Sequence, residues 1–371
     1  MEPALLTDPG FWKDPAPAAA GEFPGGVPDF QELAGHVLFE TSGSSGAPKW
    51  IALSKSALLA SADAVNAHLG VTRDSRWALA LPVRHVGGFG VCARAHAAGC
   101  GLEHFNEPWD ARVFTKWAET RAISHLSLVP TQVHDLVSGD FKAPSSLRAI
   151  VVGGGRLEQG GGQAARDLGW PVLASFGMTE TCSQIATQTL DSARLPYHPS
   201  PIPLLPIWQA GITSAGRLKI SGPALFSGHL IQQEGDWEFL PQKDDWFETR
   251  DLARIDGHSI TPMGRADTLV KVLGELVDPE LIERKLGELS GGTLKPGTFA
   301  VVAVPDPRME HALIPVFEKA VPIEVIRRVL EAYARQAPGY RRLRPETLLE
   351  TLPRSPMGKL RRGEIRNTLG G

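Results

Sequence analysis

Cysteine, tyrosine and methionine are scarce in this chain of 371 residues, which contains three, three and five of them. Cys92, Cys100 and Cys182 cannot form a closed set of disulfides, and no two of them have CxxC spacing. This usage favours a reducing compartment, and we expect the cytoplasm. No histidine is spaced with the three thiols in a recognisable activating pattern, so we interpret them as small buried residues rather than nucleophiles.

Long apolar runs and an excess of positive charge are also missing. No stretch approaches the roughly 20 apolar residues of a membrane span, and Glu2, Pro3 and Pro9 stand where a signal peptide needs basic and then apolar residues. The formal net charge of −3 gives no basic surface for nucleic acid. With 42% hydrophobic and 21% charged residues, the composition is that of a globular protein with no nucleic-acid partner and no membrane span.

The first two thirds of the chain alternate between helical and strand-like patterns. Residues 1 to about 35 are rich in proline, glycine and alanine and read as a lead-in. Leu58, Ala62, Val65 and Leu69 then follow helical spacing before Gly70. Apolar runs typical of strands follow at 77–81, 123–129, 149–152 and 172–175. This rhythm predicts an α/β fold with a largely parallel sheet covered by helices.

The pattern changes after Pro203. Residues 211–260 form short alternating segments punctuated by glycine, which predict a β-rich subdomain. Beyond Arg265 the pattern is mixed α+β, with helices over 279–286 and 323–335 and strands over 299–304 and 313–317. We therefore expect a large N-terminal domain over residues 1–265 and a small, mobile C-terminal domain over residues 266–371.

A segment rich in glycine and hydroxyl groups precedes a lysine near residue 45. Its glycines let backbone N–H groups turn toward a ligand, its hydroxyls add donors, and its lysine adds a positive charge. The pattern predicts a cradle for a polyphosphate made by Thr41, Ser42, Gly43, Ser44, Ser45, Gly46 and Lys49.

This segment does not fit the Walker A motif of NTP hydrolases. Pro48 stands directly before the lysine, and Trp50 occupies the place of the magnesium-binding hydroxyl. Residues 50–53 also read as a strand rather than a helix. Taken alone, the segment is equally an ordinary surface loop.

Further polar and glycine-rich segments follow the predicted strands. Because ligands bind at the carboxyl ends of strands in open α/β sheets, we expect the first three of these segments to converge on one crevice. The segments lie at 81–88, 153–157, 176–181, 246–251, 264–274 and 353–359.

Together and in this order, the segments resemble the acyl-adenylate-forming (AMP-binding) superfamily of acyl-CoA synthetases, luciferases and adenylation domains. The resemblance covers about residues 38–366. Ser127 to Gln132 and Trp246 to Asp251 are most similar to the o-succinylbenzoate-CoA ligases of menaquinone biosynthesis. Two departures stand out. Only about 40 residues precede the phosphate loop, so much of the usual N-terminal subdomain is expected to be missing, and Arg84 stands where relatives often have an aromatic residue.

The resemblance implies an acid-thiol ligase that uses ATP, Mg²⁺ and CoA in two half-reactions. A carboxylic acid is first activated as acyl-AMP and then transferred to CoA. The resemblance assigns the Thr41–Lys49 loop to the β- and γ-phosphates, Thr179 to the α-phosphate and Glu180 to the metal ion. It also assigns Gly153, Gly154 and Gly155 to the adenine, and Asp251 and Arg265 to the ribose. Taken alone, Asp251 beside Arg250 is equally a structural ion pair.

The remaining site residues lie near the acyl pocket and in the C-terminal domain. His85 would line the channel between the acyl and CoA sites, although a core histidine is an equal reading of it. Arg94 would bind the second carboxylate of a dicarboxylic acid, and a solvent-facing arginine is the alternative. Lys359 would be the catalytic lysine of adenylation, Asp267 the hinge, and Gly274 part of the segment that approaches CoA.

The sequence leaves three questions open. The first is whether the acid substrate is o-succinylbenzoate or another aromatic or short acyl acid. A non-catalytic adenylate-binding protein is the alternative of a different class. The oligomeric state is a monomer or a homodimer.

Overall fold

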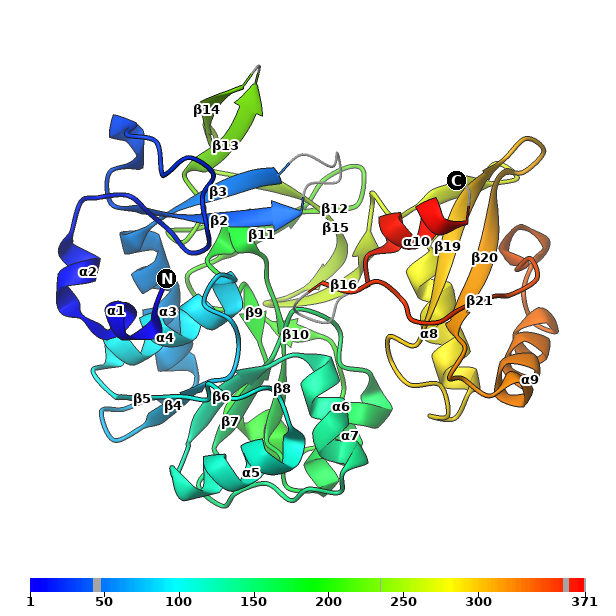
Figure 1. Ribbon diagram of the computed structural model, residues 1–371, viewed down its shortest axis with the longest axis horizontal. Helices are drawn as coiled ribbons and strands as arrows, with labels where there is room; N and C mark the ends of the chain where they lie inside the picture. Colours follow the sequence, from blue (N-terminus) through cyan, green and yellow to red (C-terminus); the bar gives the residue numbers. More distant parts are fainter. Residues whose placement is uncertain (43–47, 234, 356–359, 370–371) are drawn as a thin grey trace. The chain divides into compact units, whose positions relative to one another are not determined.

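The computed structural model describes residues 1–42, 48–233, 235–355 and 360–369. The chain divides into two compact units (Figure 1). The N-terminal unit contains Met1–Thr249 and Arg254–Pro262, and the C-terminal unit contains Arg250–Ala253 and Met263–Gly371. The division into functional domains at residue 266, with its hinge at Asp267, stays a prediction.

The predicted parallel sheet is present in the N-terminal unit. Among the described residues its order is β5-β4-β6-β7-β8-β9, and all neighbours are parallel except β8 and β9. The central strands β6 and β7 are buried along their whole length. Burial on both faces explains the continuous apolar sequence of β7, whereas β6 also buries the polar residues His125 and Ser127. The strands are β4 (Arg76–Leu79), β5 (Gly101–His104), β6 (His125–Leu128), β7 (Ala149–Val152), β8 (Val172–Phe176) and β9 (Ala186–Thr187).

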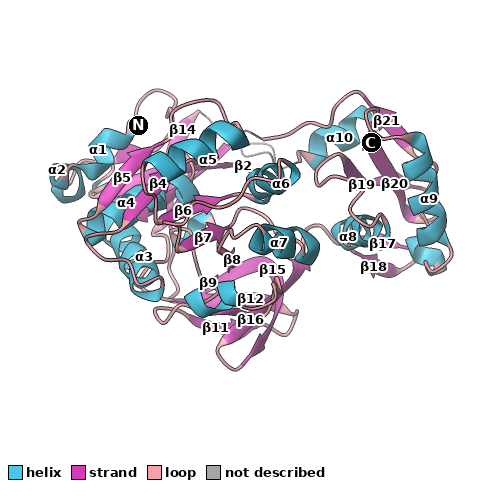
Figure 2. Cartoon of the chain, turned by 90° about the horizontal axis from the view of Figure 1, so that it is seen from below, coloured by secondary structure: helices cyan, strands magenta, loops and turns pink. Residues whose placement is uncertain are grey.

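Helices alternate with these strands along the chain, and Figure 2 shows the helices and strands in different colours. The βα rhythm expected from the sequence is thus confirmed. The first of these helices begins at Lys55 and is capped by Ser54, whose side chain accepts a hydrogen bond from the backbone N–H of Ala57. The helices are α3 (Lys55–His68), α4 (Val86–Ala98), α5 (Ala111–Thr120), α6 (Pro130–Ser138) and α7 (Gln159–Asp167).

A second sheet holds the strands that flank the predicted phosphate loop. Its order in the described residues is β1-β2-β3-β13-β14, and β2 and β3 form an antiparallel hairpin. One face buries an apolar cluster built around Leu38, Trp50 and Leu230. The strands are β1 (Ala18–Ala19), β2 (His36–Ser42), β3 (Pro48–Ser54), β13 (Gly228–Gln233) and β14 (Asp236–Pro241).

The β-rich subdomain predicted after Pro203 is also present. It is a sheet in the order β10-β16-β15-β12-β11 within the described residues. The strands are β10 (Ile202–Pro203), β11 (Gln209–Ile212), β12 (Arg217–Ser221), β15 (Phe247–Asp256) and β16 (Ser259–Arg265). The N-terminal unit also contains the 3-10 turns η1 (Gln31–Leu33), η2 (Thr179–Thr181) and η3 (Leu190–Arg194).

The C-terminal unit has the expected α+β composition. Its sheet β19-β20-β21 carries apolar clusters around Val301, Phe317 and Val329 and around Val302, Val316 and Ile365. The elements are β17 (Val270–Val272), β18 (Glu275–Val277), α8 (Pro279–Leu289), β19 (Phe299–Asp306), β20 (Glu310–Glu318), α9 (Ile323–Ala334), η4 (Gly339–Arg341), β21 (Thr347–Leu349) and α10 (Arg362–Thr368). No helix in the described parts of either unit has the length and apolar character needed to cross a membrane.

Residues 1–35 form no separate domain, as expected, but they contribute to the core of the N-terminal unit. Two short helices, α1 (Pro3–Thr7) and α2 (Pro9–Lys13), bury Leu6, Phe11 and Trp12. The Trp12 ring stacks on His96 of α4 at 5.2 Å between centroids, and its Nε1 donates to the Leu6 carbonyl at 2.9 Å. The proline and glycine content hid this segment because its burial depends on contacts with α4, far along the chain.

Replacing Trp12 tests whether this segment is part of the core. We expect Trp12→Ala to lower the free energy of unfolding by about 3–5 kcal/mol, because it removes a buried aromatic side chain and leaves a cavity. Urea denaturation of the full chain measures this. Leu195→Ala is the control, since that side chain is exposed, and it should change stability by less than about 0.5 kcal/mol. A Trp12 variant as stable as the control would show that the segment contributes nothing to the core.

Candidate active site

The site residues of the N-terminal unit follow strands that run in the same direction. His85 comes after β4, Gly153 to Gly155 come after β7, and Thr179 and Glu180 come after β8. Carboxyl ends of parallel strands meet at one edge of a sheet. The structure therefore brings these three predicted segments to the same edge, as the sequence suggested.

The glycine segment after β7 lies close against its neighbours. Gly154 has a left-handed backbone with φ of 73°, and a Cβ added there would lie 3.3 Å from Cγ1 of Val129. A Cβ at Gly153 would lie 3.1 Å from Oγ of Ser175 in β8. The left-handed backbone therefore favours glycine at position 154, and the lack of room for a Cβ favours glycine at position 153.

The segment after β8 turns sharply through the 3-10 turn η2, which contains Thr179 and Glu180. A Cβ at Gly177 would lie only 1.5 Å from the Ser183 carbonyl oxygen, so the chain folds back on itself here. Ser183 itself has φ of 103°, which is unusual for a residue with a side chain. The Glu180 carbonyl accepts from the backbone N–H of Phe226 at 2.9 Å, and both Thr179 and Glu180 are half-buried.

The predicted phosphate loop joins β2 to β3. Thr41 pairs with Lys49 across the hairpin, and the Thr41 Oγ1 donates to the Lys49 carbonyl at 3.1 Å. The strand character of Trp50 and its neighbours is confirmed, since they lie in β3. Gly43, Ser44, Ser45 and Gly46 lie outside the described residues, and the structure describes only the backbone of Ser42.

His85 stands immediately before α4, and its Nε2 is buried with no hydrogen-bond partner in the described parts of the chain. Burial lowers the pKa of its imidazole, and the positive charge of the neighbouring Arg84 lowers it further. The ring is therefore neutral at pH 7 and retains hydrogen-bonding capacity for a ligand.

Arg94 is the most buried charged side chain that the sequence predicted as a site residue, with 1% of its surface exposed. Its Nη1 donates to Oγ of Ser127 in β6 at 3.1 Å, and its Nη2 donates to Oγ of Ser183 at 3.5 Å. Its guanidinium carbon lies 5.3 Å from the ring centroid of Trp77. The reading of Arg94 as a solvent-facing residue is thus wrong.

No carboxylate in the described parts of the chain forms an ion pair with Arg94. Burial lowers the pKa of its guanidinium to about 10, so the side chain remains charged at pH 7. A buried charge whose nearest partners are neutral hydroxyls and an aromatic face is costly. An anionic ligand group would offset that cost.

The three cysteines have no sign of nucleophilic activation. Burial raises the pKa of the Cys92 thiol to about 12 and raises the pKa of the Cys182 thiol as well. Cys100 is partly buried, and its pKa is raised for the same reason. All three are free thiols, and a raised pKa keeps them protonated at neutral pH.

The C-terminal unit holds the other predicted site residues. The Asp267 carboxylate accepts from Arg265 at 2.8 Å to each oxygen and from Arg250 at 3.3 Å. These contacts, first the hydrogen bond from Arg265, lower the pKa of Asp267. Arg250 therefore pairs with the predicted hinge residue, and Asp251 lies next to it in β15.

Gly274 occupies the turn between β17 and β18 with φ of 81°, and its N–H donates to Oε1 of Glu310 at 3.0 Å. Lys359 lies outside the described residues. No group of three or more His, Cys, Asp or Glu side chains in the described part of the chain forms a cluster able to hold a metal ion.

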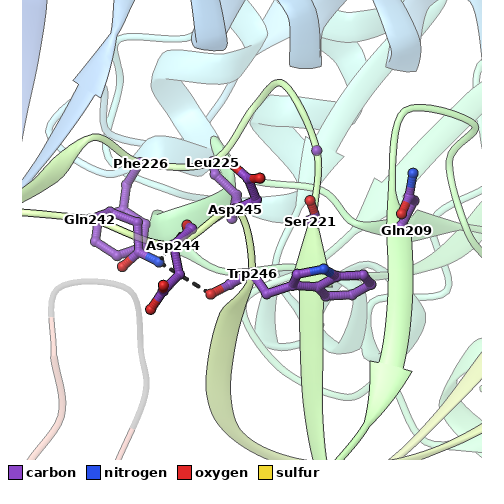
Figure 3. A pocket seen from close by; sticks show the side chains of 9 residues that line it. Gln209, Ser221, Leu225, Phe226, Gln242, Asp244, Asp245 and Trp246 are labelled. Atoms are coloured by element: carbon purple, nitrogen blue, oxygen red, sulfur yellow. Dashed lines mark hydrogen bonds between the residues drawn. The ribbon is translucent and has the colours of Figure 1, made fainter.

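A separate pocket of about 510 Å³ lies in the β-rich subdomain (Figure 3). Figure 3 shows the Trp246 ring beside it, and the Nζ of Lys219 lies 4.9 Å from the centroid of that ring. Trp246 belongs to one of the sequence segments that carry the family resemblance, but none of the predicted site residues lines this pocket. Its lining is Gln209, Ser221, Gly222, Leu225, Phe226, Gln242, Asp244, Asp245 and Trp246.

Three residues that hold Arg94 were not predicted from the sequence. Ser127 belongs to a stretch that resembles the ligases, so the sequence marked this position. It did not indicate that the Ser127 hydroxyl contacts Arg94. Ser183 and Trp77 gave no signal at all, because they meet Arg94 only through the packing of β4, β6 and the turn after η2.

Removing the Ser127 hydroxyl tests how Arg94 is held. We expect Ser127→Ala to lower the free energy of unfolding by about 1.5–3 kcal/mol, because a buried cation loses a hydrogen-bond acceptor. Ser138→Ala is the matched control, since the Ser138 hydroxyl contacts His134 at the exposed end of α6. Urea denaturation compares the two, and equal stabilities would mean that Ser127 does not support the charge of Arg94.

Comparison with known proteins identifies relatives of the whole arrangement. The model of the AMP-binding enzyme family matches residues 34–228, more than half of the chain. The 2-succinylbenzoate–CoA ligase of Enterococcus faecalis is 26% identical over 340 residues, which cover 87% of this chain and 67% of that protein. The chain thus spans about two thirds of the length of this relative.

Solved structures share the fold. The o-succinylbenzoate CoA synthetase (MenE) from Bacillus subtilis in complex with the acyl-adenylate intermediate OSB-AMP matches with a TM-score of 0.75 and 23% identity, over 90% of this chain and 69% of that one. ATP-bound MatB from Rhodopseudomonas palustris matches with the same TM-score and identity, over 90% of this chain and 67% of that one. These likenesses confirm the predicted fold class.

Proposed function

Because the chain belongs to the AMP-binding enzyme family and is an acid–CoA ligase of its AMP-forming class, we propose that its acid is o-succinylbenzoate. The enzyme would join this dicarboxylic acid to CoA by way of an acyl-adenylate. This reaction would place it in menaquinone biosynthesis.

The observation that carries the proposal is the buried, positively charged Arg94. A monocarboxylic acid uses its only carboxylate in the reaction with ATP, and so it has no charge left for a cation in the acyl pocket. A dicarboxylic acid keeps one carboxylate, which requires a buried cation because an unpaired charge is costly there. Arg94, held by Ser127 and Ser183, offers such a cation.

The adenylation half-reaction needs positioning and charge stabilisation more than covalent chemistry. In the proposal, the Thr41–Lys49 loop binds the β- and γ-phosphates, Thr179 binds the α-phosphate, and Gly153 to Gly155 approach the adenine. The half-buried carboxylate of Glu180 fits Mg²⁺, which prefers oxygen ligands and neutralises phosphate charge when bound. Asp251 and Arg265 are proposed to bind the ribose.

The second half-reaction transfers the acyl group to the CoA thiol. In the proposal, Lys359 stabilises charge during acyl-AMP formation, and rotation of the C-terminal domain at Asp267 then brings the segment around Gly274 toward CoA. The neutral His85 is proposed to line the channel between the acyl and CoA sites and to donate a hydrogen bond to the acyl carbonyl.

The direct test is pyrophosphate release by the full chain with a panel of carboxylic acids, with and without CoA. We expect the highest kcat/KM with o-succinylbenzoate and thioester only when CoA is present. Equal or better turnover of a monocarboxylic acid would exclude the proposed substrate but leave the ligase activity standing.

Arg94 variants test the substrate more closely. We expect Arg94→Ala to raise KM for o-succinylbenzoate by about 10–100-fold, because a charge-assisted contact worth about 1.5–3 kcal/mol is lost. The KM for a benzoate-like monoacid should change by far less. Arg76→Ala, which removes an exposed arginine paired with Glu103, is the control, and Arg94→Lys retains the charge if the alanine variant folds poorly. A similar rise for both acids would assign Arg94 a structural role.

Lys359 and Asp267 separate the two half-reactions. We expect Lys359→Ala to slow acyl-AMP formation by about 10²–10³-fold, the usual loss for one preorganised charge-stabilising donor, and to spare thioester formation from preformed acyl-AMP. Asp267→Pro should have the reverse effect, because proline restricts backbone rotation at the hinge. Rapid-quench measurements of each half-reaction check both, and equal damage to both steps by each substitution would contradict the two-conformation mechanism.

A further inference from the structure

Two largely buried arginine–carboxylate pairs lie in the C-terminal unit. Arg354 pairs with Glu318, and Arg362 pairs with Glu283. The two arginines stand on either side of Lys359 in the sequence, five positions before it and three after it. Their contacts therefore act on both flanks of the segment that contains the proposed catalytic lysine.

The flank before Lys359 is attached to β20 and to the turn before β19. The Arg354 Nη2 donates to Oε1 of Glu318 at 2.8 Å and to the Gly297 carbonyl at 2.8 Å. The same Glu318 oxygen accepts from the backbone N–H of Leu352 at 3.1 Å, which fixes the carboxylate as well. Leu352 is buried against β19 and β20.

The flank after Lys359 is attached to α8 and β19. The Arg362 guanidinium donates two hydrogen bonds to Glu283, from Nη2 at 2.6 Å and from Nε at 3.2 Å, and its Nη1 lies 3.1 Å from Glu280. The Glu283 Oε1 also accepts from the backbone N–H of Val301 at 2.8 Å. Two-pronged pairs of this kind fix orientation as well as position.

The two flanks also meet each other. Arg354 and Leu360 form an antiparallel β-bridge, and the N–H of Arg361 donates to the Pro353 carbonyl at 2.9 Å. Helix α10 packs on β19 (Figure 1), and its Ile365 is fully buried. The described residues on both sides of the segment are therefore fixed to one sheet and to each other.

Other ion pairs nearby differ in their exposure. In Arg361–Glu364 the two side chains are 50% and 52% exposed, whereas in Arg362–Glu283 they are 25% and 12% exposed. Exposed pairs contribute little to structure, while a buried, two-pronged pair holds its partners in place. Arg361 is thus a natural control, because it adjoins Arg362 and carries the same charge.

We propose that Arg354 and Arg362 are positioning residues for acyl-AMP formation, because they fix both ends of the segment that contains Lys359. The inference rests on the proposed function, in which Lys359 stabilises charge in the first half-reaction only. A displacement of about 1 Å of a positioned group can cost about 10²-fold in rate. Loosening either arginine therefore slows adenylation and spares the transfer to CoA.

The test uses lysine substitutions in the full chain, because lysine keeps the charge but lacks the planar guanidinium. Lysine at 362 cannot form the two-pronged contact with Glu283, and lysine at 354 replaces the Nη2 that contacts both Glu318 and the Gly297 carbonyl with a flexible ammonium group. We expect Arg362→Lys and Arg354→Lys to slow acyl-AMP formation by about 10–100-fold. Thioester formation from preformed acyl-AMP should change by less than about threefold, and Arg361→Lys should alter both rates by less than about threefold. Thermal unfolding of each variant shows whether it is folded at the assay temperature.

Hydrogen–deuterium exchange supplies a readout that does not depend on activity. We expect faster exchange of backbone amides over residues 352–355 and 360–362 in Arg362→Lys and Arg354→Lys, and unchanged exchange in Arg361→Lys. If Arg362→Lys does not fold, the results for Arg354→Lys alone test the positioning role.

Folded variants that adenylate at the wild-type rate, or that lose both half-reactions equally, overturn the positioning role. Unchanged exchange over residues 352–355 and 360–362 overturns it as well. A wild-type chain that forms no acyl-AMP with any acid overturns the proposed function and this role with it. An active wild type with unaffected variants overturns only the inference.

Discussion

The common direction of β4, β6, β7 and β8 is the constraint on which the N-terminal unit depends. Because these strands are parallel neighbours, the segments that follow them emerge at one edge of the sheet. Residues nearly a hundred positions apart, from His85 to Glu180, are thereby brought to one edge. The helices between the strands serve this arrangement, since each returns the chain to the opposite edge.

Burial of arginine recurs in both units with opposite chemistry. Arg94 lies among serine hydroxyls and the face of Trp77 with no carboxylate paired to it in the described residues. Arg362 is instead matched by Glu283, which itself accepts a backbone hydrogen bond. A buried cation without a paired anion is costly and indicates a ligand-binding role. A buried cation that is paired with a carboxylate indicates a structural role.

The N-terminal segment shows how a short sequence can contribute to the core. Lys55 at the start of α3 donates to the Asp14 carbonyl at 2.7 Å and lies over the Phe11 ring, with its Nζ 4.4 Å from the ring centroid. Burial lowers the pKa of this lysine, and the nearby Asp14 opposes that effect. Helices α1 and α2 are too short to be stable alone, so these contacts and the packing of Trp12 on α4 hold them.

The sequence by itself determined the alternation of strands and helices, the β-rich subdomain and the order of the functional segments. These are local properties, since the apolar period and the glycines at turns act over a few residues. The apolar runs at 149–152 and 172–175 therefore matched the strands β7 and β8 within a residue.

Only the tertiary structure decided which side chains share an environment. The sequence marked Arg94 as a candidate, but its burial and its contacts with Ser127 and Ser183 depend on three elements that meet in space. The same holds for Trp12 and His96, and for Arg362 and Glu283, which lie far apart in sequence. Burial and pairing arise from contacts between distant parts of the chain, and no local pattern encodes them.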